Sequence, residues 1–170
     1  MSNTNPAAIW IKNPLATFAQ DSDGGVVIQG QKIIELVSLG ETPNTHIDEV
    51  YDASASVLLP GLINTHHHFY QTLTRAYPEA LNKELFPWLK SLYKVWANIQ
   101  PEMLAVSTEL AISELLLSGC TTASDHHYLF PNQLENAIDI QVEEAKKLGM
   151  RVVLTRGSMS LGEKDGGLPP

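Results

Sequence analysis

The feature that most constrains this chain is a run of three histidines, His66 to His68, which comes two residues after a largely apolar stretch over residues 57–63. The apolar stretch predicts a buried strand. Side chains alternate along an extended strand, so His66 and His68 project to one side and His67 to the other. Two imidazoles on one side of a strand end form half of a transition-metal site. We therefore predict that His66 and His68 are metal ligands; the alternative is a polar loop whose histidines bind metal only adventitiously.

Beyond this strand the sequence alternates between strand-like and helix-like segments. Such alternation is typical of βα units built around a parallel sheet. Pro101 is suited to a first helical position, and Gly119 and Gly149 are suited to the position directly after a helix. The predicted strands are 57–65, 120–126 and 150–155, and the predicted helices are about 84–98, 101–118 and from Pro131 to about 148.

Residues 1–58 have a different pattern, which predicts a small β domain. Short apolar runs are separated by turn-forming residues such as Asp23-Gly24-Gly25. Residues 26–34 are expected to form a hairpin. We therefore predict two parts, a β lobe over 1–58 and an α/β part over 59–170.

Composition and charge exclude several classes of function. The formal net charge is −8 and no cluster of Lys or Arg forms a basic patch, which argues against a nucleic-acid partner. No apolar run approaches the length of a membrane span, so no membrane association is predicted. The single cysteine, Cys120, excludes an internal disulfide and fits a reducing cytoplasm. It also excludes the zinc-deaminase design that holds its metal with a C-x-x-C pair.

The stretch PGLINTHHH resembles the first-strand motif of the amidohydrolase superfamily, whose H-x-H pair supplies two ligands to a catalytic metal at the mouth of a (β/α)8 barrel. The resemblance covers nearly the whole chain and is strongest from about residue 56 onward. Within the superfamily the chain is most similar to the purine and triazine aminohydrolase branch, and there to the 8-oxoguanine deaminase type. The segments with this similarity are 62–76, 85–89, 117–131 and 156–168.

The resemblance implies an α/β fold, the N-terminal part of an amidohydrolase-type (β/α)8 TIM barrel preceded by a small β-sandwich lobe. A complete barrel needs about 250 residues, whereas 111 residues follow Leu59 and contain three predicted strands. We therefore expect the chain to be the N-terminal portion of a longer enzyme. The remaining ligands that the resemblance implies, two histidines and an aspartate, would then lie beyond Pro170, as would the unidentified general base.

Two side chains after the ligand pair are candidates for binding a flat heterocycle. Gln71 presents a donor and an acceptor side by side, which matches the amide-like edge of a hydroxypurine or hydroxytriazine. The resemblance also implies a base contact at this position. Trp88 is the best candidate for an aromatic wall, ahead of Phe69 and Tyr70. The alternatives are a solvated glutamine and aromatic residues that belong to the core.

Polar residues also follow the second and third predicted strands, and the active site of such a barrel gathers at the C-terminal ends of its strands. His126 and His127 cannot both face the site from one strand. We expect one of them to contact substrate or relay a proton and the other to pack against a helix; the alternative is two surface histidines. Asp125 would orient a neighbour or cap the following loop. Arg156 would hold a carbonyl oxygen or negative charge of the substrate, or tie down loop carbonyls, and the serines of 158–160 follow it.

The resemblance implies a metal-dependent hydrolytic deaminase of an 8-oxoguanine-type base. One zinc or iron ion, held by His66, His68, a third histidine and an aspartate, would activate the water that displaces ammonia. The expected partner is a small heterocyclic substrate, and the resemblance implies a homodimer or larger homo-oligomer. Two alternatives stay open: a hydroxylated s-triazine amino- or chlorohydrolase, and a non-catalytic half-barrel binding module.

Overall fold

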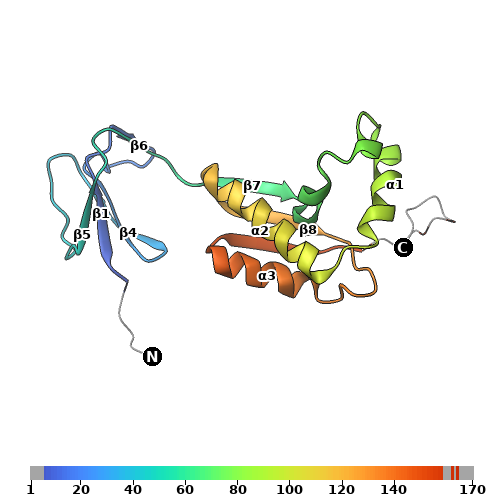
Figure 1. The fold of residues 1–170 in the computed structure, drawn as a ribbon. Helices are drawn as coiled ribbons and strands as arrows, with labels where there is room; N and C mark the ends of the chain where they lie inside the picture. Colours follow the sequence, from blue (N-terminus) through green and yellow to red (C-terminus); the bar gives the residue numbers. More distant parts are fainter. Residues whose placement is uncertain (1–5, 159–161, 163, 165–170) are drawn as a thin grey trace, which may run out of the picture. The chain divides into compact units, whose positions relative to one another are not determined.

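The computed structural model describes residues 6–158, 162 and 164. The chain divides into two compact units, Met1–Pro60 and Gly61–Pro170 (Figure 1). The boundary between the units along the chain falls between Pro60 and Gly61, close to the predicted boundary between residues 58 and 59. Within the described part of the chain, no helix is long and apolar enough to cross a membrane.

The first unit is built from short β-strands. Because β3 and β4 pair antiparallel, the predicted hairpin is confirmed. Gly30 joins them with a φ of 59°, in the left-handed region that favours glycine. Trp10 and Val27 pack in the core of this unit. The main sheet has the order β4-β3-β1-β5 and consists of β1 (Ala8–Lys12), β3 (Gly25–Gln29), β4 (Lys32–Val37) and β5 (Glu49–Asp52), while β2 (Ala16–Thr17) pairs with β6 (Val57–Leu58).

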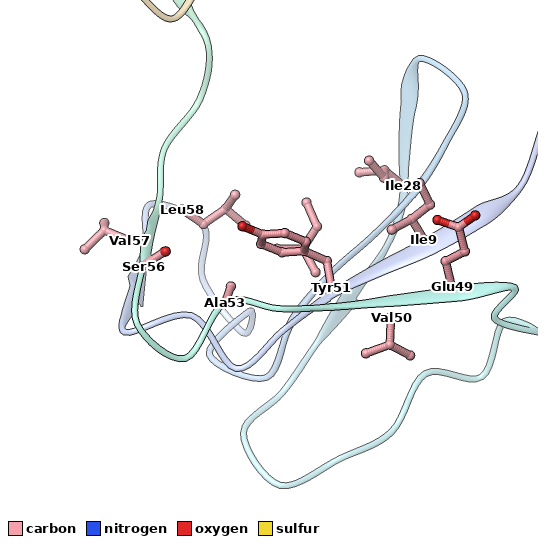
Figure 2. Close-up of a pocket in the computed structure, with 10 residues that line it drawn as sticks. Ile9, Ile28, Glu49, Val50, Tyr51, Ala53, Ser56, Val57 and Leu58 are labelled. Carbon is pink, nitrogen blue, oxygen red and sulfur yellow. The ribbon is translucent and has the colours of Figure 1, made fainter.

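An apolar hollow of about 490 Å³ lies on the first unit (Figure 2). Its walls are mostly aliphatic, with Ile9, Ile28 and Leu58 among the lining residues. Val50 and Tyr51 on β5 also line it and remain 59% and 60% exposed. An apolar sheet face is normally buried against another layer of structure. The first unit therefore has one packed core and one apolar surface that its described residues leave open.

The second unit contains a parallel sheet with the order β7-β8-β9. This topology confirms the predicted alternation of strands and helices. Helices α2 and α3 pack against each other, α2 contacts β8, and α3 contacts β9 (Figure 1). The strands are β7 (Leu62–His67), β8 (Cys120–His127) and β9 (Arg151–Arg156), and the helices are η1 (Phe69–Thr74), η2 (Pro78–Ala80), α1 (Leu85–Trp96), α2 (Pro101–Leu117) and α3 (Ala137–Leu148).

The prediction of one strand over 57–65 is wrong. The segment forms two strands, β6 in the first unit and β7 in the second, and β7 extends as far as His67. Pro60 has no N–H to donate to a sheet, which favours a break at this point. Gly61 then passes so close to β8 that a Cβ on it would lie 2.2 Å from Thr121 Oγ1. The Pro-Gly pair therefore separates two strands instead of interrupting one.

The three predicted helices are confirmed, but the third begins later in the sequence than predicted. The first two match α1 and α2 to within two residues, and Gly119 and Gly149 follow α2 and α3 with φ of 83° and 73°. The third helix begins at Ala137 instead of directly after Pro131. The intervening residues form turns, in which the Leu134 N–H donates to Pro131 O and the Ala137 N–H to Leu134 O.

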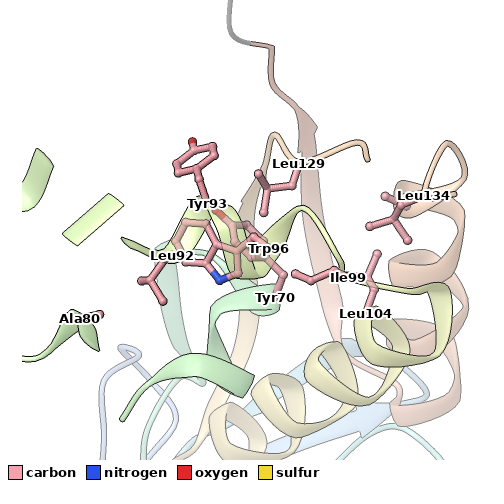
Figure 3. Packing of buried hydrophobic residues seen from close by; sticks show 10 residues of the cluster. Tyr70, Ala80, Leu92, Tyr93, Trp96, Ile99, Leu104, Leu129 and Leu134 are labelled. Atoms are coloured by element: carbon pink, nitrogen blue, oxygen red, sulfur yellow. The ribbon is translucent and has the colours of Figure 1, made fainter. Parts of the chain in front are cut away.

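Aromatic and aliphatic residues from several elements form the main core of the second unit (Figure 3). Tyr70 of η1 and Trp96 of α1 are both fully buried and meet edge to face, with ring centroids 5.1 Å apart. Leu129 and Leu134, from the segment between β8 and α3, close this cluster. The segment that follows the histidine run is therefore anchored in this core through Tyr70. Of the predicted C-terminal loop over 162–170, only residues 162 and 164 are described, and residues 159–160 also lie outside the described part.

Candidate active site

His66 and His68 lie together at the end of β7. Their Nε2 atoms are 3.2 Å apart, and the two rings meet edge to face. His66 is exposed and His68 is half-buried. His67 packs instead against the ring of Phe69, with centroids 5.1 Å apart. His66 and His68 therefore lie together as the sequence predicted, and the opposite facing of His67 stays a prediction.

A backbone carbonyl fixes the tautomer of His68. Its Nδ1 lies 2.7 Å from His126 O on β8. A carbonyl oxygen only accepts hydrogen bonds, so Nδ1 donates the proton and Nε2 keeps a lone pair. Burial lowers the pKa of His68 below its ordinary value, which favours the neutral ring. A neutral imidazole whose other nitrogen is hydrogen-bonded is the form that binds metal ions.

The spacing of the pair fits two corners of a tetrahedral metal site. Two nitrogens that each lie about 2.0–2.1 Å from a tetrahedral zinc are roughly 3.3–3.4 Å apart. The Nε2 atoms of His66 and His68 lie 3.2 Å apart, a spacing that also suits an N–H···N hydrogen bond between the rings. Within the described residues no group of three or more His, Cys, Asp or Glu side chains could hold a metal ion. The chain thus presents a histidine pair that fits zinc or iron as two of its ligands.

The two histidines at the end of β8 have different surroundings. The ring of His126 stacks on His66 with centroids 4.7 Å apart and lies 5.9 Å from His68. His127 is fully buried, its Nε2 is 2.7 Å from Leu129 O, and its ring contacts Tyr70. Burial lowers the pKa of His127 to about 4, so this ring is neutral near pH 7. Of the pair, His126 therefore lies beside the candidate metal ligands and His127 belongs to the core.

Gln71 and Trp88 line one cavity together with the histidine run. The cavity has a volume of about 380 Å³, and Arg75 also lines it. The Gln71 amide donates to Tyr70 Oη at 3.3 Å, which leaves its carbonyl oxygen for another partner. Trp88 is half-buried and leans on Trp96, with centroids 5.6 Å apart. The structure thus brings the two predicted base-binding side chains and the two predicted metal ligands to one cavity.

A second cavity of about 380 Å³ lies at the ends of β8 and β9. It is lined by His126, His127, Tyr128, Ser158 and other residues. Arg156 lines neither cavity. Its guanidinium lies 4.3 Å from the centroid of the Phe130 ring, in a cation–π contact. Arg156 pairs with His127 in the sheet, but it is the one predicted substrate contact that lines neither cavity.

Sequence reasoning missed two residues around this site, Arg75 and Gln141, and named Asp125 as one that orients a neighbour or caps a loop. Arg75 lines the first cavity and is held by a bidentate ion pair with Glu114, which raises the pKa of the guanidinium further. Asp125 is fully buried, and desolvation raises the pKa of its carboxyl to about 6. Gln141 of α3 is fully buried beside it and donates to Asp125 Oδ2 at 2.7 Å. The position of Asp125 at the end of a predicted strand was the indication for it, whereas nothing in the helix sequence singled out Gln141.

Comparison with known proteins identifies the family. Residues 57–167 match the model of the Amidohydrolase family. This chain belongs to the amidohydrolase family. Among curated proteins this amidohydrolase chain is 60% identical over 164 residues to the 8-oxoguanine deaminase of Pseudomonas aeruginosa, with 95% of the chain and 36% of that protein covered. It is 35% identical over 132 residues to an isoxanthopterin deaminase from an unknown prokaryotic organism, with 76% of the chain and 27% of that protein covered.

A solved structure shares the fold. It is a mutant atrazine chlorohydrolase from Arthrobacter aurescens TC1 complexed with zinc and atraton, with a TM-score of 0.81 and 28% identity, over 95% of this chain and 38% of that one. The amidohydrolase chain spans about a third of the length of the relatives it matches.

Proposed function

We propose that the protein containing this amidohydrolase chain is a metal-dependent hydrolytic deaminase of an 8-oxoguanine-type base. The observation that supports the proposal most directly is the pair of His66 and His68, whose Nε2 atoms lie 3.2 Å apart beside a cavity lined by Gln71 and Trp88. The 60% identity to an 8-oxoguanine deaminase supports the choice of base.

In this proposal His66 and His68 hold a zinc or iron ion through Nε2. When bound, such an ion lowers the pKa of a water molecule to about 7 and so supplies a nucleophile at neutral pH. The backbone carbonyl of His126 keeps His68 in the tautomer that presents its Nε2 lone pair. Burial of His68 favours its neutral ring, so no proton has to leave before metal binds near pH 7.

The cavity beside the histidines suits a flat, amide-edged ring. Gln71 would pair with that edge through its amide carbonyl, and Trp88 would cover one face of the ring. His126, stacked on His66, would contact the part of the substrate nearest the metal. His127 and Arg156 are the remaining proposed contacts; in this structure His127 is buried and Arg156 stacks on Phe130.

We also propose that β7, β8 and β9 are the first strands of a (β/α)8 barrel, and that the first unit is part of a β-sandwich lobe. The parallel order β7-β8-β9 with α2 and α3 between the strands supports the barrel. The apolar hollow of the first unit supports a sandwich, since a second β layer would cover it. The proposal also includes a homo-oligomer, which rests on the family resemblance alone, and a cytoplasmic location, which the single free cysteine, Cys120, supports.

The test uses the protein expressed from its complete reading frame and loaded with zinc. We expect kcat/KM to be higher for 8-oxoguanine than for a hydroxylated amino-triazine. The reverse order would support the triazine alternative, which the atrazine chlorohydrolase neighbour favours structurally. Stoichiometric metal binding without turnover of either ring would leave the non-catalytic binding module as the better description.

A further inference from the structure

A buried carboxylate binds the backbone immediately after His68, the second histidine of the pair. Asp125 of β8 is fully buried, and its Oδ1 accepts a hydrogen bond from the backbone N–H of Phe69 at 2.6 Å. Phe69 is the residue immediately after His68. A buried carboxylate is costly unless donors satisfy it, so its presence here needs a reason.

The next residue of β8 holds the imidazole itself. The carbonyl of His126 accepts a hydrogen bond from His68 Nδ1 at 2.7 Å. Two successive residues of β8 therefore hold two successive residues of the neighbouring segment, Asp125 through the backbone of Phe69 and His126 through the ring of His68. The β7–β8 pairing is irregular between Asn64 and His67, so strand pairing alone does not fix this segment.

A helix residue in turn holds the carboxylate. Gln141 of α3 is fully buried and donates from Nε2 to Asp125 Oδ2 at 2.7 Å. Its carbonyl oxygen Oε1 is buried and has no hydrogen-bond partner within the described residues. Each carboxylate oxygen of Asp125 thus has one donor, one from the segment after the ligand and one from the helix that covers the sheet.

We propose that Asp125, held by Gln141, is a positioning residue for the metal ligand His68. It fixes the backbone after His68 so that the ring meets the His126 carbonyl and presents Nε2 beside that of His66. This inference rests on the proposed function, because it assumes that His66 and His68 bind the metal. It assigns a role to a residue that lines neither of the two cavities.

The experiment measures zinc affinity of the full protein by competition with a chelator, and the visible spectrum of the Co²⁺-loaded protein. Asp125→Ala removes both acceptors, and we expect a loss of about 10- to 100-fold in zinc affinity, with an altered cobalt spectrum. Asp125→Asn should stay close to wild type in both readouts. Its side-chain oxygen still accepts from the Phe69 N–H, and the Gln141 amide can turn over to offer Oε1 to the new NH2 group.

Met150→Ala is the matched control for lost stability. Met150 is buried in the second core cluster and directly precedes β9, at the opposite end of the sheet from His68. Truncating a buried methionine to alanine costs about 2–5 kcal/mol, so this variant is destabilised without touching the ligand pair. We expect its zinc affinity and cobalt spectrum to match wild type.

Three results would overturn the inference. They are an Asp125→Ala variant with wild-type affinity and spectrum, an Asp125→Asn variant as impaired as Asp125→Ala, and a Met150→Ala variant that loses affinity equally. The second would show that negative charge matters instead of hydrogen-bonded position. If His66→Ala leaves zinc binding unchanged, the proposed function is wrong, and the inference is wrong with it. That failure can be told apart from a failure of the inference alone, because it is seen in a variant that keeps Asp125.

Discussion

The ends of β7 and β8 lie side by side in one parallel sheet, with His67 paired opposite Asp125, yet they differ in accessibility. At the end of β7, His66 is exposed and His68 is half-buried, so a ligand can reach both. At the end of β8, Asp125 and His127 are fully buried and hydrogen-bonded. Polar residues at neighbouring strand ends therefore need not share a role. His66 and His68 of β7 suit binding, whereas the buried Asp125 and His127 of β8 suit a supporting role.

The largest expected effect comes from truncating the accessible histidines of β7. His66→Ala or His68→Ala leaves a single histidine, and we expect loss of both bound metal and turnover. His67→Ala is the matched control, because its ring packs on Phe69, and metal content should stay near the wild-type level. Metal per chain after gel filtration and kcat on 8-oxoguanine measure the outcome. Loss of metal in His67→Ala would contradict the facing of the three side chains.

The buried histidine of β8 should affect stability instead of metal content. His127→Ala removes a fully buried ring and leaves Leu129 O without its donor, so we expect a loss of about 2–4 kcal/mol in the free energy of unfolding. His46→Ala is the control, since that side chain is 92% exposed and its truncation should have little effect. Denaturant unfolding and metal analysis separate the two roles. A His127→Ala variant of normal stability that lacks metal would break the contrast between the strands.

The two buried groups of β8 should also give opposite pH dependences. Desolvation raises the pKa of Asp125 to about 6 and lowers that of His127 to about 4. Asp125 contributes most to the free energy of unfolding below its unfolded pKa near 4, and this contribution is lost as pH rises through about 6. The contribution of His127 to the free energy of unfolding is fully present above its unfolded pKa near 6.5 and is lost as pH falls through about 4.

His67 and His68 shift in the same direction as His127, again mainly through desolvation. We therefore expect stability to rise with pH between about 4 and 6.5, and Asp125→Asn to make that rise steeper because the opposing group is gone. Thermal unfolding at several pH values, with the metal load held constant, measures both slopes. Parallel curves for wild type and Asp125→Asn would show that Asp125 titrates normally in the folded protein.

The sequence predicts what depends on local pattern and misses what depends on packing between distant segments. Strand alternation was enough to place His66 and His68 on one side, and helix-end glycines located the ends of α2 and α3. The Asp125–Gln141 contact joins residues 16 positions apart, across a loop whose turns delay α3 until Ala137. Residues 137–148 contain several polar side chains, and only the packed sheet decides that Gln141 is the one that is completely buried, at 0% exposed against 7% for Glu144.

The smallest expected effect concerns Arg156, at the end of β9. Its contact with the Phe130 ring is worth about 0.5–1 kcal/mol at an exposed site, so Arg156→Ala should lower stability by no more than that. If Arg156 also binds a substrate oxygen, the variant should raise KM by roughly tenfold, as expected for a charged hydrogen bond, with metal content unchanged.

Arg151→Ala is the matched control for Arg156, since Arg151 begins the same strand at the opposite end and bonds Thr122 Oγ1. We expect Arg151→Ala to leave KM unchanged. Steady-state kinetics on 8-oxoguanine with both variants decides between the roles. An unchanged KM in Arg156→Ala would remove Arg156 from the substrate contacts. The substrate contacts proposed within the described residues would then be Gln71, Trp88, His126 and His127, each of which lines one of the two cavities.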